Sequence, residues 1–258
     1  MKGLAFLDLD GSVISSKRGR WGDDQKPVAF NDEGEPTSFI NKQQKALLEL
    51  LSAYFRLIPA TARDVADYRR VKLPFTDYAI CSFGAVILTP AGEVEPTWHK
   101  QMSERAAAER DNIGRMVELF KATAARLNLD VRVQQMEDAG LSLYVNVKRV
   151  GAKEGVLAQL FEAMREHLPA GWWTHANGKN LAFLPALLGK EHAVKWFVEN
   201  LAGPHGMRIA LGDGRTDLGF MALAHMAIAP VNSQIFSDRA ATSPGGAPAD
   251  GAPTGKER

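Results

Sequence analysis

The sequence predicts an α/β fold in which a parallel-sheet core is interrupted by an inserted α+β unit. Three observations support this prediction. Short apolar strands alternate with helices at both ends of the 258-residue chain, an order typical of a parallel sheet. The middle of the chain has a different order, helix-strand-strand repeated twice. At each end, an Asp-Gly pair closely follows an apolar strand.

The first core segment is expected over residues 1–88. Apolar runs bounded by turn residues predict its strands, and Leu47, Leu50 and Leu51 at helical spacing predict its main helix. A polar stretch with Gly, Pro and charges predicts an extended loop or hairpin. In chain order we expect a strand, this loop or hairpin, a helix, a strand, a short helix and two strands, at residues 3–7, 15–38, 41–54, 55–59, 65–70, 78–81 and 85–88.

The inserted unit is expected over residues 89–188. Ile113, Met116 and Phe120 on one face predict a long helix. Two antiparallel strand pairs behind two helices would form one α+β layer. Such inserts usually lie over the carboxyl ends of the core strands, where α/β sheets bind ligands. The helices are expected at 103–127 and 153–167, and the strands at 131–135, 141–147, 172–175 and 181–184.

The α/β alternation returns over residues 189–238. The final residues, 239–258, are rich in Ala, Gly and Pro, which predicts a disordered tail outside the fold. In the second core segment we expect a helix, a strand, a helix and a strand, at residues 190–200, 208–211, 217–223 and 226–229.

The composition excludes several classes of partner. Lys plus Arg number 31 against 30 Asp plus Glu, so overall charge favours neither nucleic acid nor a membrane surface. No apolar run is long enough to span a bilayer, and the N-terminus does not resemble a signal peptide. Cys81 is the single cysteine, which fits a reducing compartment, and we expect it to be buried. A cytoplasmic protein, monomer or homodimer, is therefore expected.

Asp8 and Asp10 follow the first strand and precede Gly11 and Ser12. Residues at i and i+2 of an extended chain point to the same side, so the two carboxylates would lie together and repel each other. A hard cation with oxygen ligands, such as Mg²⁺, would stabilise them, and Gly11 permits a sharp turn with exposed amides. A surface turn after a strand is the alternative interpretation.

A second acidic motif follows a strand near the C-terminal end. Asp213 stands between two glycines, and Asp217 comes four residues later. Asp217 has a structural alternative as the N-cap of the following helix, whereas Asp213 has none. This motif therefore favours a functional site.

Two further positions suggest anion binding. Thr61 follows a strand, where its hydroxyl would hold a phosphate oxygen, and Arg63 would add a charge-assisted contact. The simpler role for Thr61 is a helix N-cap. Lys190 lies at a helix start, where the dipole disfavours a cation, which suggests an anionic partner; taken alone, a solvated surface lysine is the simpler interpretation.

Together, Asp8-x-Asp10-Gly11, Thr61, Lys190 and Asp213-x-x-x-Asp217 resemble the four-motif signature of the haloacid dehalogenase (HAD) superfamily. The resemblance covers about residues 1–88 and 189–232. The insert, with its αββαββ order, is similar to the C2-type cap of the Cof-type and sucrose-phosphatase-like branch (type IIB), which includes mannosyl-3-phosphoglycerate and trehalose-phosphate phosphatases. Phe83 departs from that pattern, because many relatives have Asn-Gly-Ala where this chain has Phe83-Gly84-Ala85.

The resemblance implies a Rossmann-like HAD core and a Mg²⁺-dependent phosphatase. By this similarity Asp8 is the nucleophile that becomes an aspartyl-phosphate, Asp10 is the general acid and base, and Lys190 pairs with Asp8 and the phosphate. Asp217 would orient Lys190 or a metal-bound water. The implied phosphate ligands are Thr61, Gly11, Ser12 and Arg63, and the implied metal ligands are Asp8, Asp10 (through its main-chain carbonyl), Asp213 and Asp217.

The implied substrate is a small phosphomonoester, either a sugar phosphate or a related metabolite. Polar residues of the insert are candidate substrate contacts, and only one of Trp172 and Trp173 can face the pocket because adjacent strand residues point opposite ways. The histidines show no metal-ligand spacing. A phosphomutase or phosphotransferase, and a catalytically silent binding module, are the alternatives. The candidate substrate contacts are Asn146, Asn177, Lys179 and Asn180.

Overall fold

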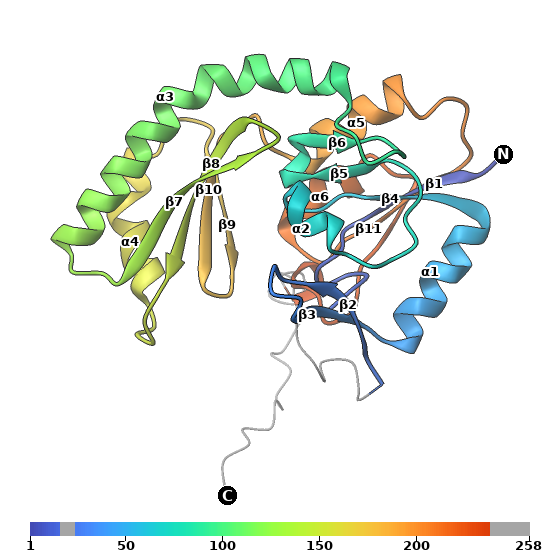
Figure 1. Cartoon of the computed structure of the whole chain (residues 1–258), viewed down its shortest axis with the longest axis horizontal. Helices are drawn as coiled ribbons and strands as arrows, with labels where there is room; N and C mark the ends of the chain where they lie inside the picture. Colours follow the sequence, from blue (N-terminus) through green and yellow to red (C-terminus); the bar gives the residue numbers. More distant parts are fainter. Residues whose placement is uncertain (16–23, 238–258) are drawn as a thin grey trace, which may run out of the picture.

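The computed structural model describes residues 1–15 and 24–237, so the predicted disordered tail lies outside the described residues. Two sheets stand side by side (Figure 1). The core sheet is parallel, with strand order β12-β11-β1-β4, which confirms the predicted class. Its strands are β1 (Gly3–Leu7), β4 (Phe55–Pro59), β11 (Arg208–Leu211) and β12 (Met226–Ile228).

Strand β1 lies inside the core sheet and is buried along its whole length. Its two faces pack into separate clusters because alternate residues point to opposite sides. Leu4 and Phe6 pack with the helix α5 (Lys190–Asn200), whereas Ala5 and Leu7 pack with α1 (Lys42–Tyr54). Helices therefore cover both faces of the sheet, as expected for a parallel α/β core.

The remaining core elements agree with the predictions in type. The segment 15–38 was predicted as an extended loop or a hairpin, and it contains a hairpin. Helix α1 begins with a capping box at Asn41. Cys81 is fully buried, as predicted. The predicted helix at 217–223 is shorter, a 3₁₀ turn at Arg215–Asp217 followed by α6. The other elements are β2 (Lys26–Phe30), β3 (Pro36–Ile40), α2 (Val65–Arg69), β5 (Ala79–Cys81), β6 (Val86–Leu88) and α6 (Leu218–Met221).

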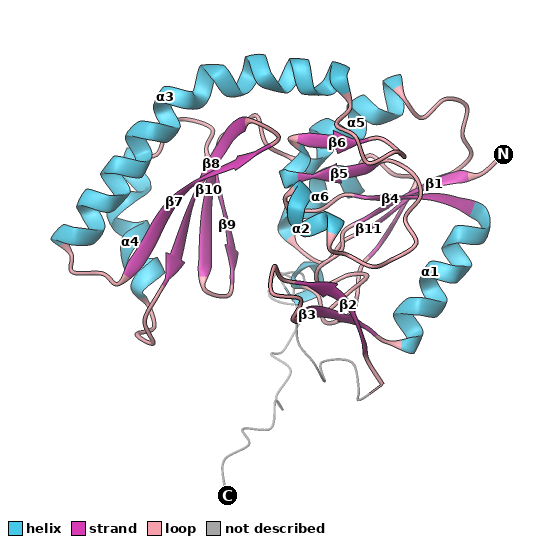
Figure 2. Cartoon of the chain, in the orientation of Figure 1, coloured by secondary structure: helices cyan, strands magenta, loops and turns pink. Residues whose placement is uncertain are grey.

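The inserted unit forms the second, antiparallel sheet, with strand order β7-β8-β10-β9. Helices α3 and α4 pack on the face of this sheet that points away from the core (Figure 2), where Phe120 and Phe183 meet with ring centroids 4.3 Å apart. The predicted double helix-strand-strand order is confirmed. The elements are α3 (Pro96–Arg126), β7 (Val131–Asp138), β8 (Leu141–Arg149), α4 (Val156–Met164), β9 (Trp173–Asn177) and β10 (Asn180–Leu184).

Helix α3 starts well before the predicted start at Ser103. Pro96 occupies its first turn, where a missing N–H costs nothing, and the Glu95 side chain accepts a hydrogen bond from the Trp98 N–H at 2.6 Å. Trp98 and Met102 are buried in the cluster that includes β1 and α5. The first turns of α3 therefore pack on the core, and its later turns pack on the antiparallel sheet.

The chain passes from the core to the cap sheet along α3 and returns to the core at residues 185–189. We propose on this basis that the core comprises residues 1–88 and 189–238 and the cap residues 89–188. Within the described ranges, none of the helices combines the length and apolar character needed to span a bilayer.

Candidate active site

The acidic motifs meet at one edge of the core sheet. Leu7 at the end of β1 is in register with Leu211 of β11 and Pro59 of β4, so the residues that follow these strands leave the sheet together. The open face of the cap sheet lies opposite this edge, and a cavity of about 480 Å³ lies between them. Its lining includes Asp8, Asp10, Gly11, Thr61, Arg63, Lys190, Asp213 and Asp217 from the core, and Tyr144, Asn146, His175, Asn177 and Asn180 from the cap.

Lys190 joins the two acidic motifs. Its Nζ lies 2.6 Å from Asp8 Oδ1 and 2.7 Å from Asp217 Oδ1, and all three side chains are buried. The alternative of a solvated surface lysine is therefore wrong. Burial alone would lower the pKa of Lys190, but the carboxylates of Asp8 and Asp217 outweigh it and raise this pKa above the ordinary value.

The Asp8 carboxyl group lies in a nearly dry environment. Burial raises its pKa to about 8 in the metal-free site; Lys190 opposes this rise, and Asp217 adds to it. The Ser12 hydroxyl donates to Asp8 Oδ2 at 3.1 Å. A metal cation that binds Asp8 would therefore displace a proton from the Asp8 carboxyl group.

The Asp217 side chain makes no capping hydrogen bond to the following helix α6, and it binds the loop before that helix instead. Its Oδ2 accepts hydrogen bonds from the backbone N–H groups of Asp213 and Gly214, each at 3.0 Å, which fixes the loop after β11. Its Oδ1 accepts from Lys190. The same carboxylate thus shapes the loop that carries Asp213 and places the ammonium beside Asp8.

Three carboxylates form a possible cation site. Asp8, Asp213 and Asp217 each offer an oxygen, and these atoms lie within 4.8 Å of one another. Gly11 makes room for this arrangement, because a Cβ there would lie 2.1 Å from Asp213 Oδ2, and its φ of +93° favours glycine. Oxygen-only donors suit a hard cation such as Mg²⁺, so the residues fit the expected metal.

The Asp10 side chain stays outside this trio. Its Oδ2 accepts from Arg63 Nε at 2.6 Å and its Oδ1 from Arg63 Nη2 at 2.7 Å, while Nη2 also donates to Ser38 Oγ on β3 at 2.8 Å. Arg63, expected from sequence to bind phosphate, therefore forms a bidentate ion pair with Asp10. The hairpin β2–β3, whose role the sequence did not indicate, supplies the third contact.

Thr61 does not cap a helix. The N-cap of α2 is Asp64, whose side chain accepts from the Asp67 N–H at 2.7 Å. The Thr61 hydroxyl instead accepts from the Arg63 N–H at 3.1 Å and lies in the cavity lining. The alternative interpretation of Thr61 as a helix N-cap is therefore wrong.

The cap contributes alternate residues of its strands. Asn146, Asn177 and Asn180 line the cavity as expected, whereas Lys179 lies in the turn between β9 and β10 and is not in the lining. One tryptophan does face inward: the Trp173 ring meets Phe83, and Trp172 packs in the cluster behind the sheet. This confirms the prediction that only one of the two adjacent tryptophans faces the pocket.

Two cap residues of the lining, Tyr144 and His175, are not among those predicted from the sequence. Each is two positions from an asparagine that was chosen, so strict alternation along β8 and β9 was the signal that would have found them. Burial lowers the pKa of His175, and Lys190 lowers it further, so His175 enters the cavity as a neutral ring.

Phe83 connects the core to the cap. Its backbone has φ +53°, uncommon for a residue other than glycine, and its ring makes edge contacts with three cap residues. Centroid distances are 5.7 Å to Tyr144, 5.8 Å to Trp173 and 5.4 Å to His175. Phe83 stands where the Asn-Gly-Ala pattern has its asparagine, so an aromatic contact with the cap replaces the amide side chain of that asparagine.

Comparison with known proteins gives one family. The family model for sucrose-6F-phosphate phosphohydrolase matches residues 7–236, which is most of the chain. No curated protein shows significant sequence similarity.

Solved structures share the fold at low identity. A sucrose-phosphatase from Synechocystis, solved with sucrose and phosphate, has 20% identity and a TM-score of 0.59, covering 96% of this chain and 90% of its own. A HAD-like hydrolase from Bacteroides thetaiotaomicron has 15% identity and a TM-score of 0.57, covering 93% and 92%. A trehalose-6-phosphate phosphatase related protein has 19% identity and a TM-score of 0.51, covering 88% and 86%. These likenesses confirm the HAD-like core with its cap.

Proposed function

Because the chain belongs to the sucrose-6F-phosphate phosphohydrolase family, and is therefore a phosphoric monoester hydrolase, we propose that it hydrolyses a small sugar phosphate through an aspartyl-phosphate on Asp8. The observation that carries this proposal is the buried contact between Lys190 and Asp8 at 2.6 Å, at the edge of the sheet where Asp213 also lies. Residues from both ends of the chain converge on one carboxylate.

The proposed first step is attack of an Asp8 oxygen on phosphorus. The bond from phosphorus to the ester oxygen breaks, and Asp10 gives its proton to the departing sugar oxygen. The hydroxyls of Thr61 and Ser12 would hold phosphate oxygens, whereas the Gly11 N–H already donates to the Ile14 carbonyl at 2.8 Å. In the second step water attacks the phosphorus of the aspartyl-phosphate, Asp10 takes the proton, and inorganic phosphate leaves with Asp8 restored.

The proposed cofactor is Mg²⁺, held by Asp8, Asp213 and the main-chain carbonyl of Asp10, with Asp217 nearby. When bound, it would offset the negative charge that the phosphoryl group and the carboxylates bring together. The chain's own contribution is Lys190, whose raised pKa keeps its charge beside Asp8.

The nucleophile assignment is tested with Asp8→Asn. We expect this variant to lose Mg²⁺-dependent phosphatase activity while keeping its circular dichroism spectrum, because the amide is a poor nucleophile of the same shape. Asp111→Asn, on the exposed side of α3, is the matched control and should retain full turnover. Undiminished turnover in Asp8→Asn would remove the assignment.

The intermediate itself is tested with Asp10→Asn. Because this variant also lacks the acid of the first step, the substrate is a radiolabelled aryl phosphate, whose leaving group departs without protonation. Without a base for the second step, the label should stay on acid-quenched protein and be released by hydroxylamine, which cleaves acyl phosphates. Adding Asp8→Asn should abolish the label. Label that persists in the double variant would place the phosphoryl group elsewhere.

A phosphomutase or phosphotransferase shares the same first step. The products separate the two activities: a hydrolase releases inorganic phosphate and free sugar in equal amounts, whereas a mutase returns an isomerised sugar phosphate. We expect phosphate release.

A further inference from the structure

The loop after β11 carries Asp213 and Asp217, two of the three carboxylates of the possible cation site. Within this loop, Asp217 Oδ2 accepts from the backbone N–H groups of Asp213 and Gly214, each at 3.0 Å. The next backbone N–H belongs to Arg215, and it donates to Gln234 Oε1 at 3.1 Å. Three successive backbone donors of the loop are therefore held by two side chains.

Gln234 belongs to a turn at residues 233–237, a short way after β12. The turn is held by its own hydrogen bonds: Ser233 Oγ accepts from the Phe236 N–H at 3.4 Å, and the Ser233 carbonyl accepts from the Ser237 N–H at 3.2 Å. The Ser233 side chain is buried. Because these bonds do not involve the loop after β11, the turn presents Gln234 to that loop as a preformed acceptor.

A second hydrogen bond joins this turn to the same loop. The Ile235 N–H donates to the Asp213 carbonyl at 3.3 Å. The backbone of Asp213 is therefore held at both of its polar groups, by Asp217 at the N–H and by the turn at the carbonyl. Gln234 also lies in the lining of the active-site cavity. The turn thus supports the loop in addition to Asp217, at the edge of the site.

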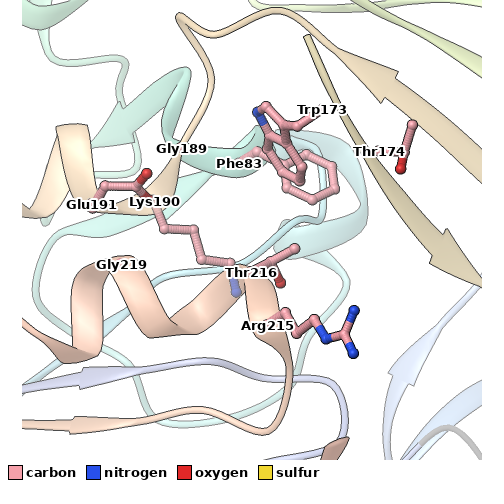
Figure 3. A pocket seen from close by; sticks show the side chains of 9 residues that line it. All are labelled: Phe83, Trp173, Thr174, Gly189, Lys190, Glu191, Arg215, Thr216 and Gly219. Atoms are coloured by element: carbon pink, nitrogen blue, oxygen red, sulfur yellow. The ribbon is translucent and has the colours of Figure 1, made fainter. Parts of the chain in front are cut away.

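The loop after β11 leads into α6 beside Lys190. Arg215 and Thr216 line a small cavity of about 240 Å³ together with Lys190 (Figure 3). Asp213 comes before this stretch of the loop and Asp217 comes after it, so a shift of the backbone at Arg215 would move both carboxylates. The oxygens of the possible cation site lie within 4.8 Å of one another. A small shift of the loop would therefore separate them.

We propose that Gln234 is a positioning residue that holds the loop after β11 in the shape that binds Mg²⁺. It acts through the Arg215 N–H rather than by contact with the metal. A loop that is ordered before the cation arrives loses no further conformational entropy on binding, so its carboxylates bind more tightly. This inference rests on the proposed function, which supplies the Mg²⁺ site.

Hydrogen exchange at the Arg215 amide in metal-free protein, measured by NMR, tests the contact with the loop. Gln234→Met removes the acceptor at nearly the same side-chain length, whereas Gln234→Glu keeps it. We expect exchange to accelerate about three- to tenfold in Gln234→Met and to stay at the wild-type rate in Gln234→Glu. Gln159→Met, exposed on α4, is the matched control and should change nothing. Equal exchange in wild type and Gln234→Met would overturn the proposal.

Calorimetric titration with Mg²⁺ tests the effect on the metal site. We expect the Mg²⁺ Kd to rise about three- to tenfold in Gln234→Met, as for loss of one uncharged hydrogen bond. In Gln234→Glu it should stay at or below the wild-type value, because the acceptor remains and a negative charge is added near the cation.

The two measurements separate this inference from the proposed function. Faster exchange at Arg215 with an unchanged Mg²⁺ Kd in Gln234→Met would overturn the positioning role. So would an equal loss of Mg²⁺ affinity in Gln234→Met and Gln234→Glu, because the second variant keeps the acceptor. If the wild-type protein binds no Mg²⁺ and hydrolyses no phosphate ester, the proposed function fails, and the exchange rates still decide whether Gln234 holds the loop.

Discussion

Arg63 directs its side-chain donors to Asp10 and Ser38 rather than to the open cavity. A bidentate contact fixes the plane of the Asp10 carboxylate, and the proposed acid must point one oxygen toward the ester oxygen. At the scale of single residues, the ion pair therefore makes Arg63 a positioning residue for Asp10. The β2–β3 hairpin contributes through Ser38, which accepts a hydrogen bond from Arg63.

Replacing Arg63 by lysine separates this role from phosphate binding. Lysine keeps the charge but cannot make the two parallel hydrogen bonds, so we expect kcat to fall about 10- to 100-fold, within the usual contribution of a general acid, with KM changed little. Steady-state kinetics measures both. A rise in KM at unchanged kcat would instead support the phosphate contact expected from the sequence.

The raised pKa of Asp8 predicts proton release on Mg²⁺ binding. Because burial moves this pKa from 3.8 to about 8, the folded metal-free protein holds a proton that the unfolded chain loses between these pH values. Its contribution to stability therefore falls as pH rises through that window. Since Mg²⁺ needs the carboxylate, its apparent affinity should rise with pH up to about 8.

Calorimetry of Mg²⁺ binding in buffers of different ionisation enthalpy measures this proton release. Asp8→Asn should bind Mg²⁺ more weakly and release no proton. An affinity that stays constant between pH 6 and about 8 would contradict the assignment of Asp8 as the group that exchanges its proton.

At the scale of elements, the turn after β1 is shaped to admit Asp213. Gly11→Ala would add a Cβ 2.1 Å from Asp213 Oδ2 and strain a φ of +93°. Gly34→Ala, in the β2–β3 turn at φ +80°, meets no atom within 4 Å. Each variant should lose about 1–3 kcal/mol of stability from backbone strain. Only Gly11→Ala should also lose Mg²⁺ affinity and turnover.

Thermal unfolding measures the strain in both variants, and calorimetry with Mg²⁺ measures the site. Because the two glycines share the backbone penalty, any difference in metal affinity reports the contact with Asp213. Equal Mg²⁺ affinities for the two variants would show that Asp213 can move aside without loss.

Elements are predicted best from the sequence where their own residues mark where they end. Strand ends bearing Asp8, Thr61 and Asp213 were located because apolar runs stop there, and the parallel register then brings them together. The start of α3 was missed because Trp98 is buried by the core, a contact distant in sequence.

Orientation within the site was also beyond sequence reasoning. The sequence leaves Arg63 two partners, a phosphate or Asp10, and only the fold decides that it meets Asp10. His175 was overlooked because it was judged by metal-ligand spacing, whereas its place follows from facing the same side of β9 as Trp173 and Asn177. Spacing along a strand would have been the better guide.

At the scale of the whole molecule, the cap is attached to the core by more than its two connections. Phe83 and Val194 of the core share one apolar cluster with Leu143, Ala182 and Leu184 of the cap. Asp138, at the end of β7, adds a polar contact: its Oδ2 accepts from the Val65 N–H at 3.0 Å and from the Ser82 hydroxyl. The contact is made by the tip of the β7–β8 hairpin, far along the chain from either connection.

Asp138→Ala should therefore loosen the cap without unfolding either sheet. The Val65 amide and the Ser82 hydroxyl lose their shared acceptor, so hydrogen exchange should accelerate in peptides containing Val65, and kcat/KM should fall about tenfold as the cap spends less time over the site. Glu137→Ala is the matched control, because its carboxylate contacts only exposed Gln135 within the described chain. Unchanged exchange at Val65 in Asp138→Ala would mean that the Phe83 cluster alone holds the cap, and the closed arrangement would then depend on apolar packing rather than on this hydrogen-bonded contact.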